Sequence, residues 1–139
     1  MFQQILVPTD FSEKSRHALD IAVKIALLGQ GTIHLLHVIK IIPHAAFEDF
    51  ESFYTSLEEH AEQEMGKLLA PYQDKQVNIE SRIIFGDRVQ DILRFAEDYN
   101  IDLIVMNSQK VDLNNPVQGW GTISYKVGVL SHCPILLVK

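Results

Sequence analysis

Two hydrophobic periods alternate along the chain. Short segments rich in apolar and β-branched residues lie at residues 5–7, 32–39, 77–85, 101–105 and 135–138, and such segments are typical of buried strands. Between them, apolar residues recur at helical spacing, which predicts four helices. Strands that are separated by helices pair in parallel through right-handed crossovers. The pattern therefore predicts one α/β domain over residues 1–139, an open, doubly wound sheet of five parallel strands with helices on both faces.

Local signals place the ends of the helices. Ser12 stands where an N-cap belongs, and Gly29 is a helix stop. The second helical pattern covers residues 50–69 and ends at Pro71. Its first aromatic residues, Phe50 and Phe53, are expected to face the core, whereas two roles stay open for Phe47, as a cover over a site or as part of a packed helix start.

Composition narrows the class of protein. The 139 residues include 12 Lys and Arg against 18 Asp and Glu, a net charge of −6, which argues against duplex nucleic acid and anionic membranes as partners. The sequence has no run of about 18 apolar residues and no basic, signal-like start. A lone Cys133 fits a reducing compartment, so we expect a cytoplasmic protein.

Candidate ligand-binding residues follow the strands. In an open parallel sheet, ligands bind at the carboxyl ends of strands where the strand order reverses. The loops after the first, second and fourth strands are therefore the candidates, together with the irregular stretch 106–119, which is longer than most strand-to-helix connections. Gly121 and Thr122 follow it, at the start of the last helix.

Six sequence pieces, in order over the whole chain, resemble the universal stress protein family. They are Ile-Leu-Val-Pro-Thr-Asp at 5–10, Leu-Leu-His-Val at 35–38, Gly-Asp at 86–87, Asp-Leu-Ile-Val-Met at 102–106, Gly-Thr at 121–122 and Cys-Pro-Ile-Leu-Leu-Val at 133–138. The resemblance implies the strand order 3-2-1-4-5 and a switch point between the first and fourth strands. It also implies a homodimer formed through the last strand, that is, through Ile135, Leu136, Leu137 and Val138.

Some members of this family bind ATP, and the resemblance transfers part of their site. Asp10 matches the ribose aspartate, Val38 the adenine-side position, and Gly121-Thr122 the end of a glycine-rich phosphate loop. Asn107 and Lys110 stand in place of the first two glycines of that loop, with the spacing stretched by one residue. The expected lining of an adenine nucleotide site is Pro8, Thr9, Asp10, Val38, Met106, Asn107, Ser108, Lys110, Gly121 and Thr122.

These residues predict a protein that acts by binding and regulation rather than turnover. Glycines let backbone N–H groups approach phosphate closely, so an incomplete loop predicts weak or absent binding of ATP and its Mg²⁺. A clear calorimetric signal with micromolar ATP and magnesium would contradict that. The alternative is an ATP- or AMP-binding sensor or slow ATPase that uses the same cleft, with Lys110 replacing the lost glycine contact.

Other kinds of site find less support. His34 and His37 are three apart in a strand and are expected on opposite faces, so they cannot share a metal ion. His60 and Glu64, one helical turn apart, lack a third ligand. Cys133 is expected to be a buried, inert thiol. A flavodoxin-like phosphate loop and the acid cluster of a response-regulator receiver are both missing, and no catalytic residue is predicted.

Overall fold

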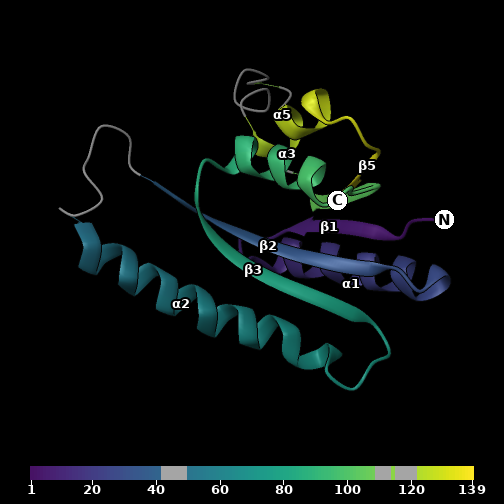
Figure 1. Ribbon diagram of the computed structural model, residues 1–139, viewed down its shortest axis with the longest axis horizontal. Coiled ribbons are helices and arrows are strands. Elements are labelled where there is room, and N and C mark those ends of the chain that lie inside the picture. The colour runs from purple at the N-terminus through teal and green to yellow at the C-terminus, as the bar shows by residue number, and fades with distance from the viewer. Residues whose placement is uncertain (42–49, 109–113, 115–121) are drawn as a thin grey trace.

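The computed structural model shows an open sheet with helices on both faces (Figure 1) and describes residues 1–41, 50–108, 114 and 122–139. The strands are β1 (Gln4–Pro8), β2 (Thr32–Lys40), β3 (Asn78–Gly86), β4 (Leu103–Asn107) and β5 (Ile135–Val138). Their order is β3-β2-β1-β4-β5, and every neighbouring pair is parallel. The predicted fold class and strand order are confirmed.

In the described part of the chain, four α-helices cover the sheet, two on each face. They are α1 (Glu13–Gly29), α2 (Glu51–Leu69), α3 (Arg88–Asp98) and α5 (Ile123–Leu130), and a short 3-10 helix, Ala70–Tyr72, follows α2. Alternate residues of the strands pack against α1 and α2 on one face and against α3 and α5 on the other. None of the described helices is both long and apolar enough to cross a membrane.

Short side chains close the amino ends of three helices. Ser12 caps α1 by accepting a hydrogen bond from the Ser15 N–H, as predicted. Asp87 and Thr122 cap α3 and α5 in the same way. Because all three helices start at the carboxyl edge of the sheet, these caps fix the loops that surround the expected site.

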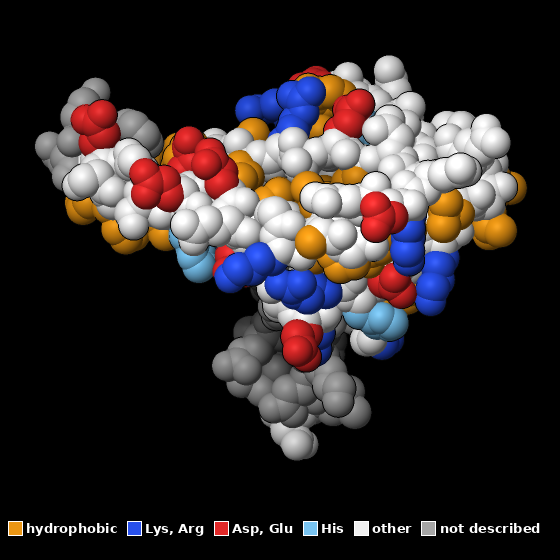
Figure 2. Space-filling model, turned by 90° about the horizontal axis from the view of Figure 1, so that it is seen from below, with side chains coloured by type: hydrophobic (Ala, Val, Ile, Leu, Met, Phe, Trp, Pro, Cys, Tyr) orange, Lys and Arg blue, Asp and Glu red, His pale blue; other side chains and the backbone are white. Residues whose placement is uncertain are grey.

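The start of α2 differs from the prediction. Phe50 is 37% exposed and Phe53 is 49% exposed, whereas the neighbouring Tyr54 is 1% exposed. The buried stripe of α2 runs through Tyr54 and continues to Leu68. Phe53 precedes Tyr54 by one residue, which turns it about 100° away from that stripe. Figure 2 accordingly shows hydrophobic side chains on the surface near the beginning of α2, and Phe47 lies outside the described residues.

The fourth strand begins two residues later than predicted. Ile101 is buried against the α3 face, but β4 starts at Leu103. The Asp102 carboxylate accepts hydrogen bonds from the N–H groups of Gln3 and Gln4, at 2.9 and 3.1 Å. Asp102 therefore ties the chain before β4 to the start of β1.

Candidate functional site

A pocket opens at the carboxyl edge of the sheet, between the ends of β1 and β4, where the strand order reverses. Six of the ten predicted site residues line it: Pro8, Thr9, Asp10, Val38, Met106 and Asn107. Five further residues complete the described lining: Leu36, Arg88, Ile92, Ile123 and Ser124. The pocket thus combines the ends of β1, β2 and β4 with the first turns of α3 and α5.

The β1–α1 loop that carries Asp10 is held in a defined shape. The buried Thr9 hydroxyl lies 2.9 Å from the Ser15 hydroxyl and accepts the Phe11 N–H at 3.0 Å. Phe11 adopts a positive φ of 65°, a conformation that is uncommon for a residue other than glycine. The Thr9 hydroxyl is therefore used inside the loop, and it positions Asp10 rather than a ligand.

Asp10 is an exposed carboxylate at the pocket wall. Its Oδ1 accepts the Ser12 N–H at 3.0 Å, a local turn that orients the side chain. Burial raises the pKa of Asp10, but hydrogen bonds from Ser12 and Ser15 outweigh it and leave the pKa below its usual value of 3.8. Asp10 is consequently an anion at neutral pH and can accept hydrogen bonds from a ligand.

The inner walls of the pocket are apolar. Leu36, Val38 and Met106 come from the face of the sheet that α3 and α5 cover, and all three are buried. Ile92 of α3 and Ile123 of α5 add to the same surface. An apolar slot with a few polar groups at its rim is typical of sites that bind planar organic ligands.

Two polar groups lie where the pocket meets the helices. Arg88, the first residue of α3, is the one Lys or Arg in the described lining. The Ser124 hydroxyl of α5 is buried and lies 3.3 Å from the Thr122 hydroxyl. Thr122 Oγ1 accepts the Tyr125 N–H, so this predicted site residue acts as the helix cap, and it is not among the described residues that line the pocket.

The remaining predicted site residues are placed differently. Ser108 is buried beside the pocket residue Asn107, and its hydroxyl accepts a hydrogen bond from the Lys139 ammonium at 3.0 Å. It does not line the described pocket. Lys110 and Gly121 lie outside the described residues.

Sequence reasoning missed two informative lining residues. Leu36 precedes Val38 by two positions in β2 and so lies on the same face, which strand periodicity could have indicated. Arg88 follows β3, whose loop was not among the three candidate loops. It reaches the pocket because α3 starts at the same edge of the sheet.

The histidine and cysteine candidates lie on different surfaces of the protein. His34 packs near Phe95 and Tyr99 of the α3 layer, whereas His37 stacks on Phe11, so the prediction of opposite faces is confirmed. Among the described residues no three His, Cys, Asp or Glu side chains could hold a metal ion together. Cys133 is half-buried rather than buried, with its Sγ 3.4 Å from the Ser131 hydroxyl, because it lies in a turn at the end of α5.

An open parallel sheet with a pocket at its switch point is typical of α/β proteins that bind small ligands at this edge of the sheet. A family model described as the universal stress protein family matches residues 1–139. The chain therefore belongs to the universal stress protein family.

Individual relatives agree over nearly full length. The chain is 28% identical over 149 residues to universal stress protein YxiE of Bacillus subtilis, with 100% of both chains covered. The solved structure of MJ0577, a universal stress protein of Methanocaldococcus jannaschii, is 30% identical with a TM-score of 0.84, covering 100% of this chain and 96% of that one.

Two further similar structures are complexes with adenine nucleotides. One is a universal stress protein in complex with cAMP, 22% identical with a TM-score of 0.68, covering 99% of this chain and 97% of that one. The other is the universal stress protein from Archaeoglobus fulgidus in complex with dAMP, 16% identical with a TM-score of 0.72, covering 99% and 98%. At these identities the likeness shows the fold.

Proposed function

We propose that the carboxyl-edge pocket binds the adenosine part of an adenine nucleotide, and that the protein acts through this binding rather than through turnover. One observation carries the proposal: six residues that the sequence singled out, at or near the ends of three different strands, line a single pocket at the switch point.

The described pocket suits adenosine in shape and polarity. The apolar surface of Leu36, Val38 and Met106 can contact both the edge and the face of a purine base. Asp10 supplies a charged acceptor for the ribose hydroxyl groups, and hydrogen bonds to charged groups are among the stronger ones. The cAMP and dAMP complexes of the two similar proteins support a ligand with one phosphate.

The described pocket offers fewer groups that could bind a triphosphate than groups that could bind adenosine. In the described lining, only Arg88 brings a positive charge, while Ser124 brings a hydroxyl group. Asn107, which takes the place of the first glycine of the phosphate loop, carries a Cβ atom that limits close backbone approach. We therefore expect the phosphates beyond the first to add little affinity, and hydrolysis to be absent.

Calorimetry with adenosine, AMP and ATP plus Mg²⁺ tests this proposal. We expect AMP to bind, and ATP to bind no more than about tenfold more tightly than AMP, a difference of about 1.4 kcal/mol. Absence of any signal with all three ligands would contradict the proposed site. Tight ATP binding with release of phosphate would instead support the alternative, an ATP sensor or slow ATPase. Analysis of nucleotide released by heating the purified protein gives an independent answer.

We further propose that two chains pair through β5. This strand is the last in the sheet order, and Leu136 and Leu137 are each 38% exposed on its two faces. Val129 and Leu130, at the end of the helix before β5, are also exposed. A strand at a sheet edge with apolar side chains is stabilised by antiparallel pairing with a second copy.

Light scattering at micromolar concentration tests the dimer. We expect a dimer mass for the wild-type chain and a shift toward monomer for Leu137→Asp. Leu28→Asp is the matched control, because Leu28 is 90% exposed on α1 and is not part of β5. A monomer mass for the wild-type chain would rule out this arrangement. The cytoplasmic location expected from the composition remains a prediction.

A further inference from the structure

A second, larger cavity lies beside the nucleotide pocket, between α2 and the end of β2. Its volume is about 600 Å³, compared with about 110 Å³ for the first pocket. Asp10 and Arg88 line both cavities, so the two meet at these side chains. A ligand that starts in the first pocket can therefore extend into the second without leaving the protein surface.

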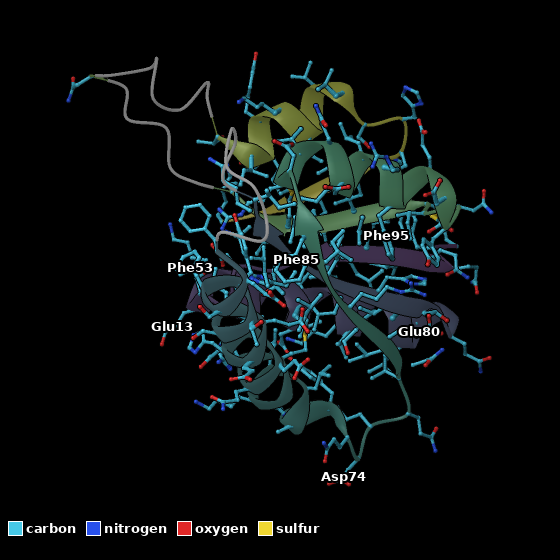
Figure 3. The ribbon with its side chains drawn as sticks, turned by 60° about the vertical axis from the view of Figure 1, so that its left-hand side comes forward. Glu13, Phe53, Asp74, Glu80, Phe85 and Phe95 are labelled. Atoms are coloured by element: carbon cyan, nitrogen blue, oxygen red, sulfur yellow. The ribbon has the colours of Figure 1, made fainter. Side chains whose placement is uncertain are left out.

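Aromatic side chains line the second cavity. The rings of Phe11 and His37 lie 4.2 Å apart with an angle of 33° between their planes. Phe53 reaches the cavity from the first turns of α2 and is 49% exposed. Figure 3 shows Phe53 on the same side of the molecule as Glu13, where the strands end, and opposite Glu80 and Phe95. Accessible aromatic rings of this kind favour stacking with a planar base.

His37 adds a hydrogen-bond acceptor to this cavity. Its Nδ1 lies 2.7 Å from the Thr9 carbonyl oxygen, and because a carbonyl only accepts, Nδ1 carries the proton. Burial lowers the pKa of His37 and outweighs the hydrogen bond to the Thr9 carbonyl, which raises it; Arg88 lowers the pKa further and Asp10 raises it. The pKa therefore stays below its usual value of 6.5, and the ring is neutral at pH 7. Nε2 therefore holds a lone pair, which matches the amino group of an adenine base.

Positive charge lies between the two cavities and along the second one. Arg88 lines both, and Lys40, at the end of β2, lines the second. The lining also contains the acids Asp10 and Glu64, but Lys67 pairs with Glu64 at 3.4 Å. Arg88, where the two cavities meet, and Lys40, in the second cavity, can pair with bridging phosphates, while the anionic Asp10 at the same junction is left to accept hydrogen bonds from the ribose.

We propose that the two cavities together bind a dinucleotide, that is, two nucleosides joined by phosphates. The first adenosine occupies the pocket beside Asp10 and Val38, and the phosphates contact Arg88 and Lys40. The second base occupies the cavity lined by Phe11, His37 and Phe53. This inference rests on the proposed function for the position of the first nucleoside.

Calorimetry with AMP, ATP and a series of diadenosine polyphosphates with two to five bridging phosphates tests the inference. We expect at least one member of the series to bind with one ligand per chain and at least about tenfold more tightly than AMP and ATP, because stacking of a single base accounts for a gain of this size. ATP is the essential comparison, since it carries the phosphates without the second base.

Four variants test which side chains account for the higher affinity of the diadenosine ligand. Phe53→Ala is expected to remove most of it, because Phe53 contacts the second base, and Lys40→Ala is expected to remove part of it, because Lys40 contacts the phosphates; both side chains are exposed, so the fold is preserved. Phe50→Ala and Arg94→Ala are the matched controls, because these residues lie near the same elements but do not line the cavity. They are expected to keep the gain in full.

The possible results separate the two proposals. If AMP binds but no diadenosine ligand binds more tightly than ATP, the dinucleotide inference is wrong and the proposed function stands. A gain that persists in both Phe53→Ala and Lys40→Ala also overturns the inference. If neither AMP, ATP nor any diadenosine ligand binds, the proposed function fails first, because the first nucleoside has no site.

Discussion

His34 gives the protein a stability that depends on pH. The side chain is 5% exposed, and its Nε2 donates a hydrogen bond to Gln4 Oε1 at 2.7 Å. No described residue forms a hydrogen bond with Nδ1, and the Glu80 carboxylate lies 3.7 Å away from it. Burial lowers the pKa of His34 below 6.5; Glu80 opposes this shift and Arg82 adds to it. The other neighbours, Phe95 and Tyr99, are rings without a negative charge, and the Arg82 guanidinium already lies over both.

The sign and the size of the effect follow from linkage. Below pH 6.5 the unfolded chain takes up a proton at His34 while the folded chain does not, so acidification favours unfolding. The stability present above pH 6.5 is therefore lost as the pH falls toward the folded-state pKa. Between pH 7.5 and 5.5 the loss from one histidine is at most about 1.4 kcal/mol, the value for a folded state that stays unprotonated throughout. His37, whose pKa is also lowered, adds a loss of the same sign.

Urea denaturation of wild type and His34→Gln at pH 5.5, 6.5 and 7.5 measures this contribution. We expect the free energy of unfolding of wild type to fall toward pH 5.5, and the fall to be smaller in the variant by up to about 1.4 kcal/mol. Glutamine retains a donor toward Gln4, so the comparison isolates the titration. His132→Gln is the control, because the His132 side chain is 85% exposed. A variant whose pH dependence equals that of wild type would refute the reasoning.

Two other substitutions test the packing and the site. A Cβ atom at Gly31 would lie 2.6 Å from the Phe2 carbonyl oxygen, so Gly31→Ala is expected to destabilise the fold by about 1–3 kcal/mol. Gly66→Ala, in an open position of α2, is expected to stabilise it by about 0.5–1 kcal/mol, and equal effects in urea denaturation would contradict this assignment. Asp10→Ala is expected to weaken AMP binding in calorimetry by about tenfold or more, because a charged hydrogen-bond acceptor is lost. Asp74→Ala is its control, since Asp74 lies far from the pocket (Figure 3), and an unchanged AMP affinity in Asp10→Ala would exclude a contact between Asp10 and the ligand.

The sequence predicts best what depends on local patterns. Segments rich in apolar and β-branched residues predicted the five strands, and the cap at Ser12 was visible because a short hydroxyl side chain precedes a helical pattern. The exposed position of Phe53 could not be predicted in this way. Helical spacing shows that one face of α2 is buried, but it does not show which residues lie on that face. Tyr54 fixes the buried face through its contact with Phe85 in β3, with ring centroids 5.8 Å apart. Such a contact between distant segments cannot be inferred from spacing alone.

In the candidate site, too, some residues could be predicted from the sequence and others could not. Asp10 and Met106 could be predicted because they lie at or just after the carboxyl ends of strands, whereas Val38 was predicted from the resemblance to the universal stress protein family. Arg88 could not, because its role depends on the direction in which α3 leaves that edge. The second cavity could not be predicted either, because it depends on the distance between β2 and α2.

Arg88 also changes what the net charge of −6 implies for an anionic ligand. A negative chain repels such a ligand at long range, but salt at physiological strength screens that repulsion beyond about 8 Å. In the proposed dinucleotide site, the phosphates contact Arg88 and Lys40 at short range, where screening is weaker. Added salt therefore reduces both the distant repulsion and, to a smaller extent, the local attraction. For this reason the affinity for a phosphate-bearing ligand should depend much less on salt than it does in a protein that binds anions through a basic surface.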